Sequence, residues 1–140
     1  MAPLTGRCLC GSVSYRCDAG PVLTALCHCE DCQHQTGTTF SIVVVVPSAA
    51  LTIAGESLAT YETQERDSGA KRERRFCSNC GSPIATFMAD RPELAVIKAG
   101  TLDDRSGLQP TLELYGDSAQ PWFGESEERK RFPGSLPASG

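Results

Sequence analysis

Seven of the eight cysteines in this sequence fall into three tight groups. The groups are Cys8 with Cys10, Cys27 with Cys29 and Cys32, and Cys77 with Cys80. Short spacings of this kind turn the sulfurs of a group toward one point, and sulfurs from another group can complete the tetrahedral shell of Zn²⁺. Gly81, directly after the last group, lets the backbone turn back as in a zinc knuckle. The spacing therefore predicts zinc binding.

The number of sulfurs in each group suggests how two metal ions would share them. Two pairs and one triplet fit one site of four sulfurs, from Cys8, Cys10, Cys77 and Cys80, and one site of three, from Cys27, Cys29 and Cys32. A site with four protein ligands is structural, whereas three ligands leave a fourth position for water or substrate, as in catalytic sites. We therefore expect two zinc ions per chain, one structural and one catalytic. The catalytic set would be Cys27, Cys29 and Cys32.

Other assignments of the sulfurs stay open at this point. Cys17, His28 or His34 could complete the triplet and close the second site. Cys17 continues the inward face of a predicted strand, which is more typical of a small buried apolar residue. A thiol-redox role for Cys77 and Cys80 lacks the βαβ context of thioredoxin-like sites. A plain disulfide scaffold would require oxidised sulfurs and no metal.

The expected cellular compartment depends on whether the sequence contains a signal peptide or a membrane span. The first residues contain no apolar run of signal-peptide length. The longest apolar run, Ile42–Val46, is far shorter than the roughly 20 residues of a membrane span. We therefore expect a cytoplasmic protein without a membrane partner. Reducing conditions there disfavour disulfides and favour metal binding by clustered thiols.

Size and charge limit the remaining classes. A chain of 140 residues that is 40% hydrophobic has enough apolar material for one core. We expect a single domain over residues 1–140, with its core at about residues 6–123 and a polar tail over residues 125–140. The net charge of −4, from 13 basic and 17 acidic residues, argues against a broad contact with the phosphates of a nucleic acid, and we expect no nucleic-acid partner. The basic stretch Lys71–Arg75 contains a glutamate and is typical of a solvated face.

The elements that must position the cysteines are expected to be mostly short strands. Alternating patterns and β-branched runs indicate strands at residues 7–17, 22–27, 40–46, 51–53, 58–62, 74–76, 84–87, 94–98 and 111–115. Residues 30–36 favour a short helix that Gly37 ends. Residues 64–75 are interpreted as a solvated hairpin loop, because Asp67-Ser68-Gly69 interrupts the charged stretch. The predicted class is mainly β, with stacked or partly closed sheets.

The cysteine spacing and its flanking glycines resemble those of the glutathione-dependent formaldehyde-activating enzyme family, also called the Gfa or CENP-V domain family. The resemblance spans roughly Gly6 to Phe123. The segments that carry it are Gly6–Val13, Cys27–Cys32, Phe76–Gly81, Gly100–Asp104 and Gln120–Trp122. One departure is visible. Many members carry a histidine near the position where this chain has Glu113.

The resemblance implies an Mss4-like fold of stacked β-sheets with zinc knuckles. It implies a structural zinc on the first and last cysteine pairs and a zinc linked to catalysis on the triplet. The founding activity of the family is a carbon–sulfur lyase reaction, the condensation of glutathione with formaldehyde to S-hydroxymethylglutathione. The implied partners are therefore a small-molecule thiol, glutathione or a similar compound, and a small aldehyde.

The expected chemistry follows from the charge of the triplet site. Three thiolates and Zn²⁺ carry a formal charge of −1, which suits holding a substrate thiol as thiolate better than polarising a carbonyl. The thiolate would then capture the aldehyde as a hemithioacetal. The competing interpretation is a non-catalytic zinc module that binds a protein or nucleic acid.

Several other side chains are candidates for roles around such a site. His28 and Glu30 lie between the triplet cysteines and could relay a proton, orient a ligand or face solvent. Trp122, beside Pro121, fits core packing better than a pocket wall. Eight cations could meet the carboxylates of glutathione, although each is more often solvated. They are Arg66, Lys71, Arg72, Arg74, Arg75, Arg91, Lys98 and Arg105.

Overall fold

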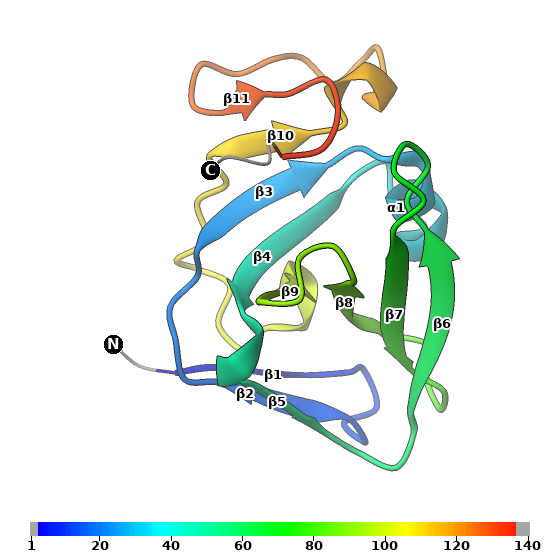
Figure 1. Ribbon diagram of the computed structural model, residues 1–140. Helices are drawn as coiled ribbons and strands as arrows, with labels where there is room; N and C mark the ends of the chain where they lie inside the picture. Colours follow the sequence, from blue (N-terminus) through cyan, green and yellow to red (C-terminus); the bar gives the residue numbers. More distant parts are fainter. Residues whose placement is uncertain (1–2, 137–140) are drawn as a thin grey trace. The chain divides into compact units, whose positions relative to one another are not determined.

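The computed structural model describes residues 3–136, in which strands dominate and α1 (Glu30–Thr36) is the one α-helix (Figure 1). These residues divide into two compact units. The first runs to Val22 and then from Val44 to Gly107, and the second comprises Leu23–Val43 and the chain from Leu108. No helix within residues 3–136 has the length and apolar character needed to cross a bilayer.

The first unit contains a three-stranded antiparallel sheet in the order β1-β2-β5. In β2, Tyr15 and Cys17 are buried while Ser14 and Arg16 are exposed, which is the alternation that the sequence predicts. The predicted strand over residues 7–17 is nevertheless interrupted, because the chain between β1 and β2 forms a turn around Cys8 and Cys10. The strands are β1 (Leu4–Arg7), β2 (Ser14–Cys17) and β5 (Leu51–Ala54).

The first unit also contains four strands that pair antiparallel in chain order. The prediction of a solvated loop over residues 64–75 is wrong in its second half, because β7 begins at Lys71. Arg72 and Arg74 lie buried in this strand, since Asp90 and Thr63 accept hydrogen bonds from them. The strands are β6 (Leu58–Gln64), β7 (Lys71–Cys77), β8 (Pro83–Met88) and β9 (Leu94–Lys98).

The second unit is built on the central strand β10, which pairs in parallel with β3 on one side and β11 on the other. Gly37 ends α1 in the left-handed conformation, with φ 72°, as the sequence predicts. The predicted helix over residues 30–36 is confirmed. The strands are β3 (Leu23–Cys27), β10 (Leu112–Leu114) and β11 (Lys130–Arg131).

Strand β4 (Ser41–Pro47) spans the boundary between the units in the sequence. Four consecutive valines, Val43–Val46, are buried in it, which is typical of a strand covered on both faces. Short 3₁₀ helices complete the described elements: η1 (Ser48–Ala50), η2 (Ala99–Thr101) and η3 (Gly116–Ser118).

The mainly β class is confirmed by these elements. The single domain over residues 1–140 stays a prediction. The predicted polar tail, residues 125–140, contains β11, and residues 137–140 of it lie outside the described residues.

Candidate metal centres

The first unit brings together Cys8, Cys10, Cys77 and Cys80, the four sulfurs expected to share one site. Their Sγ atoms all lie within 4.8 Å of one another. The separation is 3.6 Å between Cys8 and Cys10 and 3.8 Å between Cys10 and Cys77. A tetrahedral zinc ion with its usual Zn–S bonds holds sulfurs about 3.8 Å apart. The four-sulfur cluster therefore has the dimensions that zinc requires.

Two similar turns position these sulfurs. The turn after β1 has Gly11 at φ 83°, and the turn after β7 has Gly81 at φ 82°. Only glycine adopts this backbone conformation at no steric cost. The Cys8 amide donates to the Val13 carbonyl at 3.0 Å, and the Gly81 amide donates to the Cys77 carbonyl at 2.7 Å. Each turn thus presents its pair of thiols from a closed hydrogen-bonded loop.

Hydroxyl and amide groups surround the four-sulfur cluster. The Ser12 Oγ lies 3.1 Å from the Cys10 sulfur and 3.3 Å from the Cys77 sulfur, and Ser57 Oγ lies 3.3 Å from the Cys77 sulfur. Asn79 Nδ2 donates to the Cys10 sulfur at 3.2 Å. The two serines lower the pKa of Cys77 to about 5, and Ser12 and Asn79 lower the pKa of Cys10 to about 7. These contacts favour the thiolate form that a metal needs.

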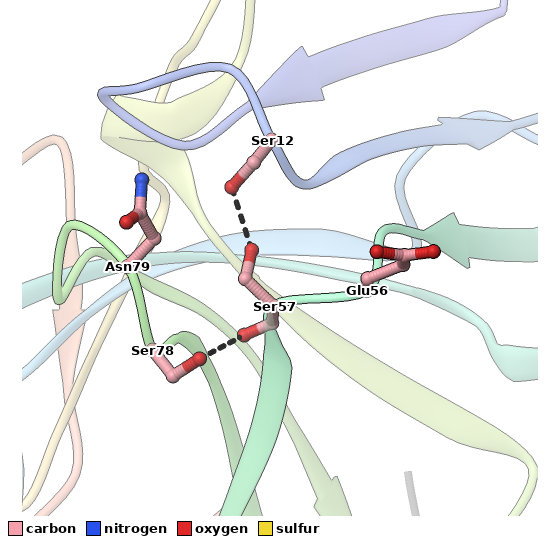
Figure 2. A pocket seen from close by; sticks show the side chains of 5 residues that line it. All are labelled: Ser12, Glu56, Ser57, Ser78 and Asn79. Atoms are coloured by element: carbon pink, nitrogen blue, oxygen red, sulfur yellow. Dashed lines mark hydrogen bonds between the residues drawn. The ribbon is translucent and has the colours of Figure 1, made fainter.

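These polar groups border an open hollow of about 480 Å³. Figure 2 shows the side chains that line it. Ser12 and Ser57 share a hydrogen bond of 2.6 Å in it, and the Ser78 hydroxyl donates to the Ser57 carbonyl. None of these residues was predicted from the sequence to belong to the site. Ser12 lies two residues after Cys10 and Asn79 lies between Cys77 and Cys80, so both were open to detection, whereas Ser57 has no local signal. The hollow is lined by Ser12, Glu56, Ser57, Ser78 and Asn79.

The second unit brings together the three sulfurs of Cys27, Cys29 and Cys32. Cys27 ends β3, Cys29 caps the N-terminus of α1, and Cys32 lies in the first turn of that helix. Their Sγ atoms lie within 4.8 Å of one another, and those of Cys27 and Cys32 are 3.5 Å apart. The Cys32 amide donates to the Cys29 sulfur at 3.1 Å. The turn that brings the three sulfurs together is therefore also the start of helix α1.

The triplet differs from the four-sulfur cluster in its electrostatics. The neighbouring thiols of Cys29 and Cys32, together with burial, raise the pKa of Cys27 well above its ordinary value. A hydrogen bond with Cys27 lowers the pKa of Cys29, but Cys32 and burial outweigh it and raise the pKa to about 11. Three thiolates cannot share this volume unless a cation neutralises them. The donor set therefore fits a thiophilic divalent ion such as zinc.

The remaining candidate ligands do not join the triplet. Among residues 3–136, the cluster contains neither His28, His34 nor Cys17. Cys17 is fully buried, and its thiol donates to the Ala19 carbonyl at 3.4 Å. The interpretation of Cys17 as a small buried residue is confirmed.

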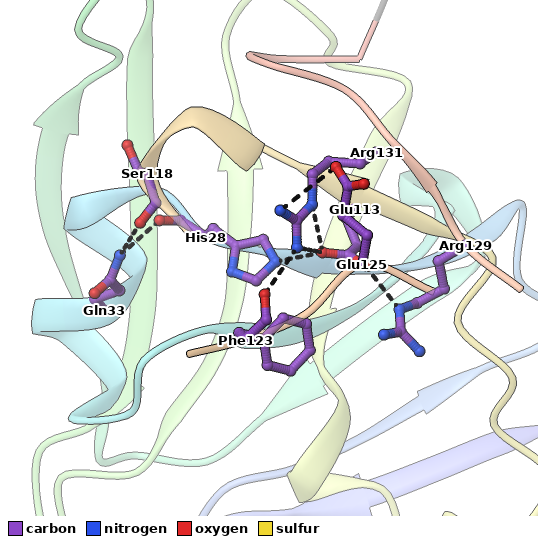
Figure 3. Close-up of polar contacts among 8 residues, drawn as sticks. All are labelled: His28, Gln33, Glu113, Ser118, Phe123, Glu125, Arg129 and Arg131. Atoms are coloured by element: carbon purple, nitrogen blue, oxygen red, sulfur yellow. Dashed lines mark hydrogen bonds and ion pairs between the residues drawn. The ribbon is translucent and has the colours of Figure 1, made fainter. Parts of the chain in front are cut away.

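Figure 3 shows the surroundings of His28, which lies between two triplet cysteines in the chain. His28 and Glu113 are both fully buried, and His28 Nε2 lies 2.8 Å from Glu113 Oε1. Arg129 and Arg131 also donate to the Glu113 carboxylate. Burial alone would raise the pKa of Glu113, but hydrogen bonds from His28, Arg129 and Arg131 outweigh it and hold the pKa below its ordinary value. In the sequence, Glu113 stands out only as a departure from the family, and neither arginine was predicted to belong to the site.

Two further expectations need correction. Trp122 does not pack in the core, because 68% of its surface is exposed, while its neighbour Phe123 contacts Phe40. Among the candidate cations, Arg72, Arg74 and Lys98 are buried rather than solvated. The stretch expected to form a solvated basic face therefore offers less charge to a phosphate backbone than its composition suggests.

Comparison with known proteins gives three similarities. The family described as glutathione-dependent formaldehyde-activating enzyme matches residues 3–118. A protein of Halomonas elongata, whose name assigns it provisionally to the glutathione-dependent formaldehyde-activating enzymes, is 29% identical over 133 residues, which cover 91% of this chain and 85% of that protein. The crystal structure of a Rhodobacter sphaeroides protein is similar in fold, with a TM-score of 0.56 and 23% identity over 76% of this chain and 91% of the other.

Proposed function

This chain belongs to the glutathione-dependent formaldehyde-activating enzyme family, and on that premise we propose that it is a zinc enzyme that joins a small aldehyde to a thiol. The thiol is glutathione or a similar compound, the aldehyde is formaldehyde, and the product is S-hydroxymethylglutathione. One observation carries the proposal. Cys27, Cys29 and Cys32 form a three-sulfur cluster without a fourth protein ligand among residues 3–136.

The two clusters would divide the work between them. The four-sulfur cluster would hold a structural zinc ion, because all four ligands come from the chain. The triplet would hold the catalytic ion through Cys27, Cys29 and Cys32. Zinc bound there would supply the positive charge that keeps a substrate thiol ionised at neutral pH.

The reaction balances without an oxidant or reductant. The thiol gives up its proton, and its sulfur donates an electron pair to the aldehyde carbon. A carbon–sulfur bond forms as the π bond of the carbonyl breaks, and the oxygen takes up a proton to become the hydroxyl group. The task of the chain is to hold the two reactants together, and well-oriented intramolecular reactions can gain roughly 7–11 kcal/mol from this alone.

Carbon-13 NMR of labelled formaldehyde with glutathione tests the proposal, because line broadening and magnetisation exchange report the rate of adduct formation. We expect the protein to raise this rate above the uncatalysed one. Cys29→Ser should lower the acceleration at least tenfold, since it removes a metal ligand from the triplet. Cys17→Ser is the matched control and should keep it, because Cys17 lies outside both clusters. Equal rates with and without the wild-type protein would refute the proposal.

A further inference from the structure

We propose that Glu113 is a positioning residue for the cluster of Cys27, Cys29 and Cys32, and that it acts through His28. The inference rests on the proposed function in one respect, namely that this cluster binds a metal ion. It concerns how the chain holds two of the three sulfurs in place. The evidence is the set of contacts that converge on His28, the residue between them.

Within residues 3–136, the ring of His28 has one hydrogen-bond partner, which is Glu113. The ring is fully buried and packs against the rings of Phe40 and Phe123, with centroid separations of 5.8 Å and 5.3 Å. Nδ1 has no hydrogen-bond partner among the described residues. Since an ionised carboxylate only accepts hydrogen bonds, Nε2 must carry the proton that it donates to Glu113. The orientation of the ring therefore depends on Glu113 and on the two phenylalanines.

Glu113 is itself fixed, so it can serve as an anchor. It lies in the central strand of its three-strand group, in register with Arg131 of β11. Its Oε1 accepts from Arg131 Nε at 3.1 Å and from Arg131 Nη2 at 2.9 Å, and its Oε2 accepts from Arg129 Nε at 3.0 Å. Charge-assisted contacts of this kind are among the strongest hydrogen bonds in proteins. The carboxylate thus has little freedom to follow a moving imidazole.

The backbone of His28 is held on both sides as well. Its amide donates to the Leu114 carbonyl at 2.9 Å, which extends the pairing of β3 with β10. Its carbonyl accepts from Gln33 Nε2 of α1 at 2.7 Å. The same Gln33 amide group also donates to the Ser118 carbonyl at 3.2 Å, and Gln120 donates to Gln33 Oε1 at 3.0 Å (Figure 3 draws the contacts of Gln33 with His28 and Ser118). Backbone and ring are fixed together.

These contacts have a consequence for the flanking sulfurs. A residue held at its amide, its carbonyl and its ring cannot rotate, so the chain directions entering Cys27 and leaving toward Cys29 are set before an ion binds. Preorganised ligands bind a metal more tightly, and loss of an outer contact that orients them typically weakens metal binding 10- to 100-fold. Because Glu113 acts through a residue that is not itself a ligand, we expect a loss of zinc affinity at the lower end of this range, about tenfold.

Site-resolved Zn²⁺ affinities in the full chain test this inference, measured by competition with a chromophoric chelator. His28→Phe keeps an aromatic ring at this position but removes the Nε2 donor, and Glu113→Gln removes the negative charge of the carboxylate. Both variants should bind Zn²⁺ about tenfold more weakly at the triplet, while the four-sulfur cluster keeps its wild-type affinity. His28→Gln, whose side-chain amide can donate to Glu113 in place of Nε2, should restore most of the loss. When Co²⁺ replaces Zn²⁺, the thiolate-to-cobalt charge-transfer absorption of His28→Phe and Glu113→Gln should differ from that of the wild type only for the triplet.

The outcomes separate this inference from the proposed function. If the triplet of the wild-type chain binds no zinc ion, the proposed catalytic metal is absent and both proposals are refuted. A wild-type chain that binds two ions, with His28→Phe and Glu113→Gln matching it at the triplet, would refute the positioning role alone. Equal weakening of both clusters would also refute it, because general destabilisation would then explain the effect. Failure of His28→Gln to recover affinity would show that the Glu113 contact is not the cause.

Discussion

Loss of a four-sulfur ligand should destabilise the protein more than loss of a triplet ligand, and the loop lengths give the size of the difference. A metal stabilises a fold by its affinity for the folded chain less its affinity for the unfolded chain. An unfolded chain that joins Cys10 to Cys77 must close a loop of 67 residues, whereas joining Cys27 to Cys32 closes one of 5. By loop-closure entropy these cost about 4 kcal/mol and about 2 kcal/mol.

In the unfolded chain, loop closure therefore weakens zinc binding by the triplet cysteines less than zinc binding by the four-sulfur cysteines, and the difference is about 2 kcal/mol. For equal affinities in the folded state, Cys77→Ser should cost that much more stability than Cys29→Ser. In a chain of this size, the difference corresponds to roughly 8 °C in Tm.

Urea unfolding with saturating zinc measures the difference directly. Cys17→Ser is the matched control, because it replaces a fully buried cysteine outside both clusters and gives the cost of the exchange itself. After subtraction of that cost, we expect Cys77→Ser to unfold at clearly lower urea than Cys29→Ser. Equal midpoints for the two variants would refute the reasoning, since closing the long loop between Cys10 and Cys77 would then add nothing to stability.

Two further predictions concern packing and pH. Gly6→Ala should cost about 1–3 kcal/mol in urea unfolding, because the added methyl group would overlap the Tyr15 ring and the Thr101 carbonyl. Gly100→Ala meets no atom within 4 Å and should be close to neutral; equal effects would contradict the steric argument. The pKa of Glu113 lies below its ordinary value of 4.5, so its carboxylate stabilises the fold at neutral pH and loses that effect as pH falls below about 4.5. The stability gap between wild type and Glu113→Gln should narrow there, and a constant gap from pH 7 to pH 4 would argue against it.

The local elements near the metal centres were predictable because short-range signals define them. The helix over residues 30–36 has acidic residues in its first turn and Gly37 at its end, and the structure places its bounds there. The strand over residues 94–98 was predicted with its observed bounds. The cysteine groups were visible for the same reason, since two or three ligands within a few residues can only face one point.

The misjudged segments are those whose environment depends on distant residues. Arg72 is buried because Asp90, 18 residues away in the turn after β8, accepts a hydrogen bond from it. Arg131 lies in what sequence analysis interpreted as a polar tail, yet it binds Glu113 in the neighbouring strand. Composition alone describes such residues as solvated, because the partner that offsets their desolvation is not adjacent in sequence.

The amino-acid sequence by itself determined the family, the mainly β class and the three groups of cysteines, because each of these depends on residue types at short spacing. Only the tertiary structure decided what surrounds those sulfurs. It placed serines and an asparagine against Cys10 and Cys77, and a buried carboxylate against His28. Most of these groups lie in turns or at strand ends, and strand pairing, which is a property of the assembled sheet, decides which of them meet.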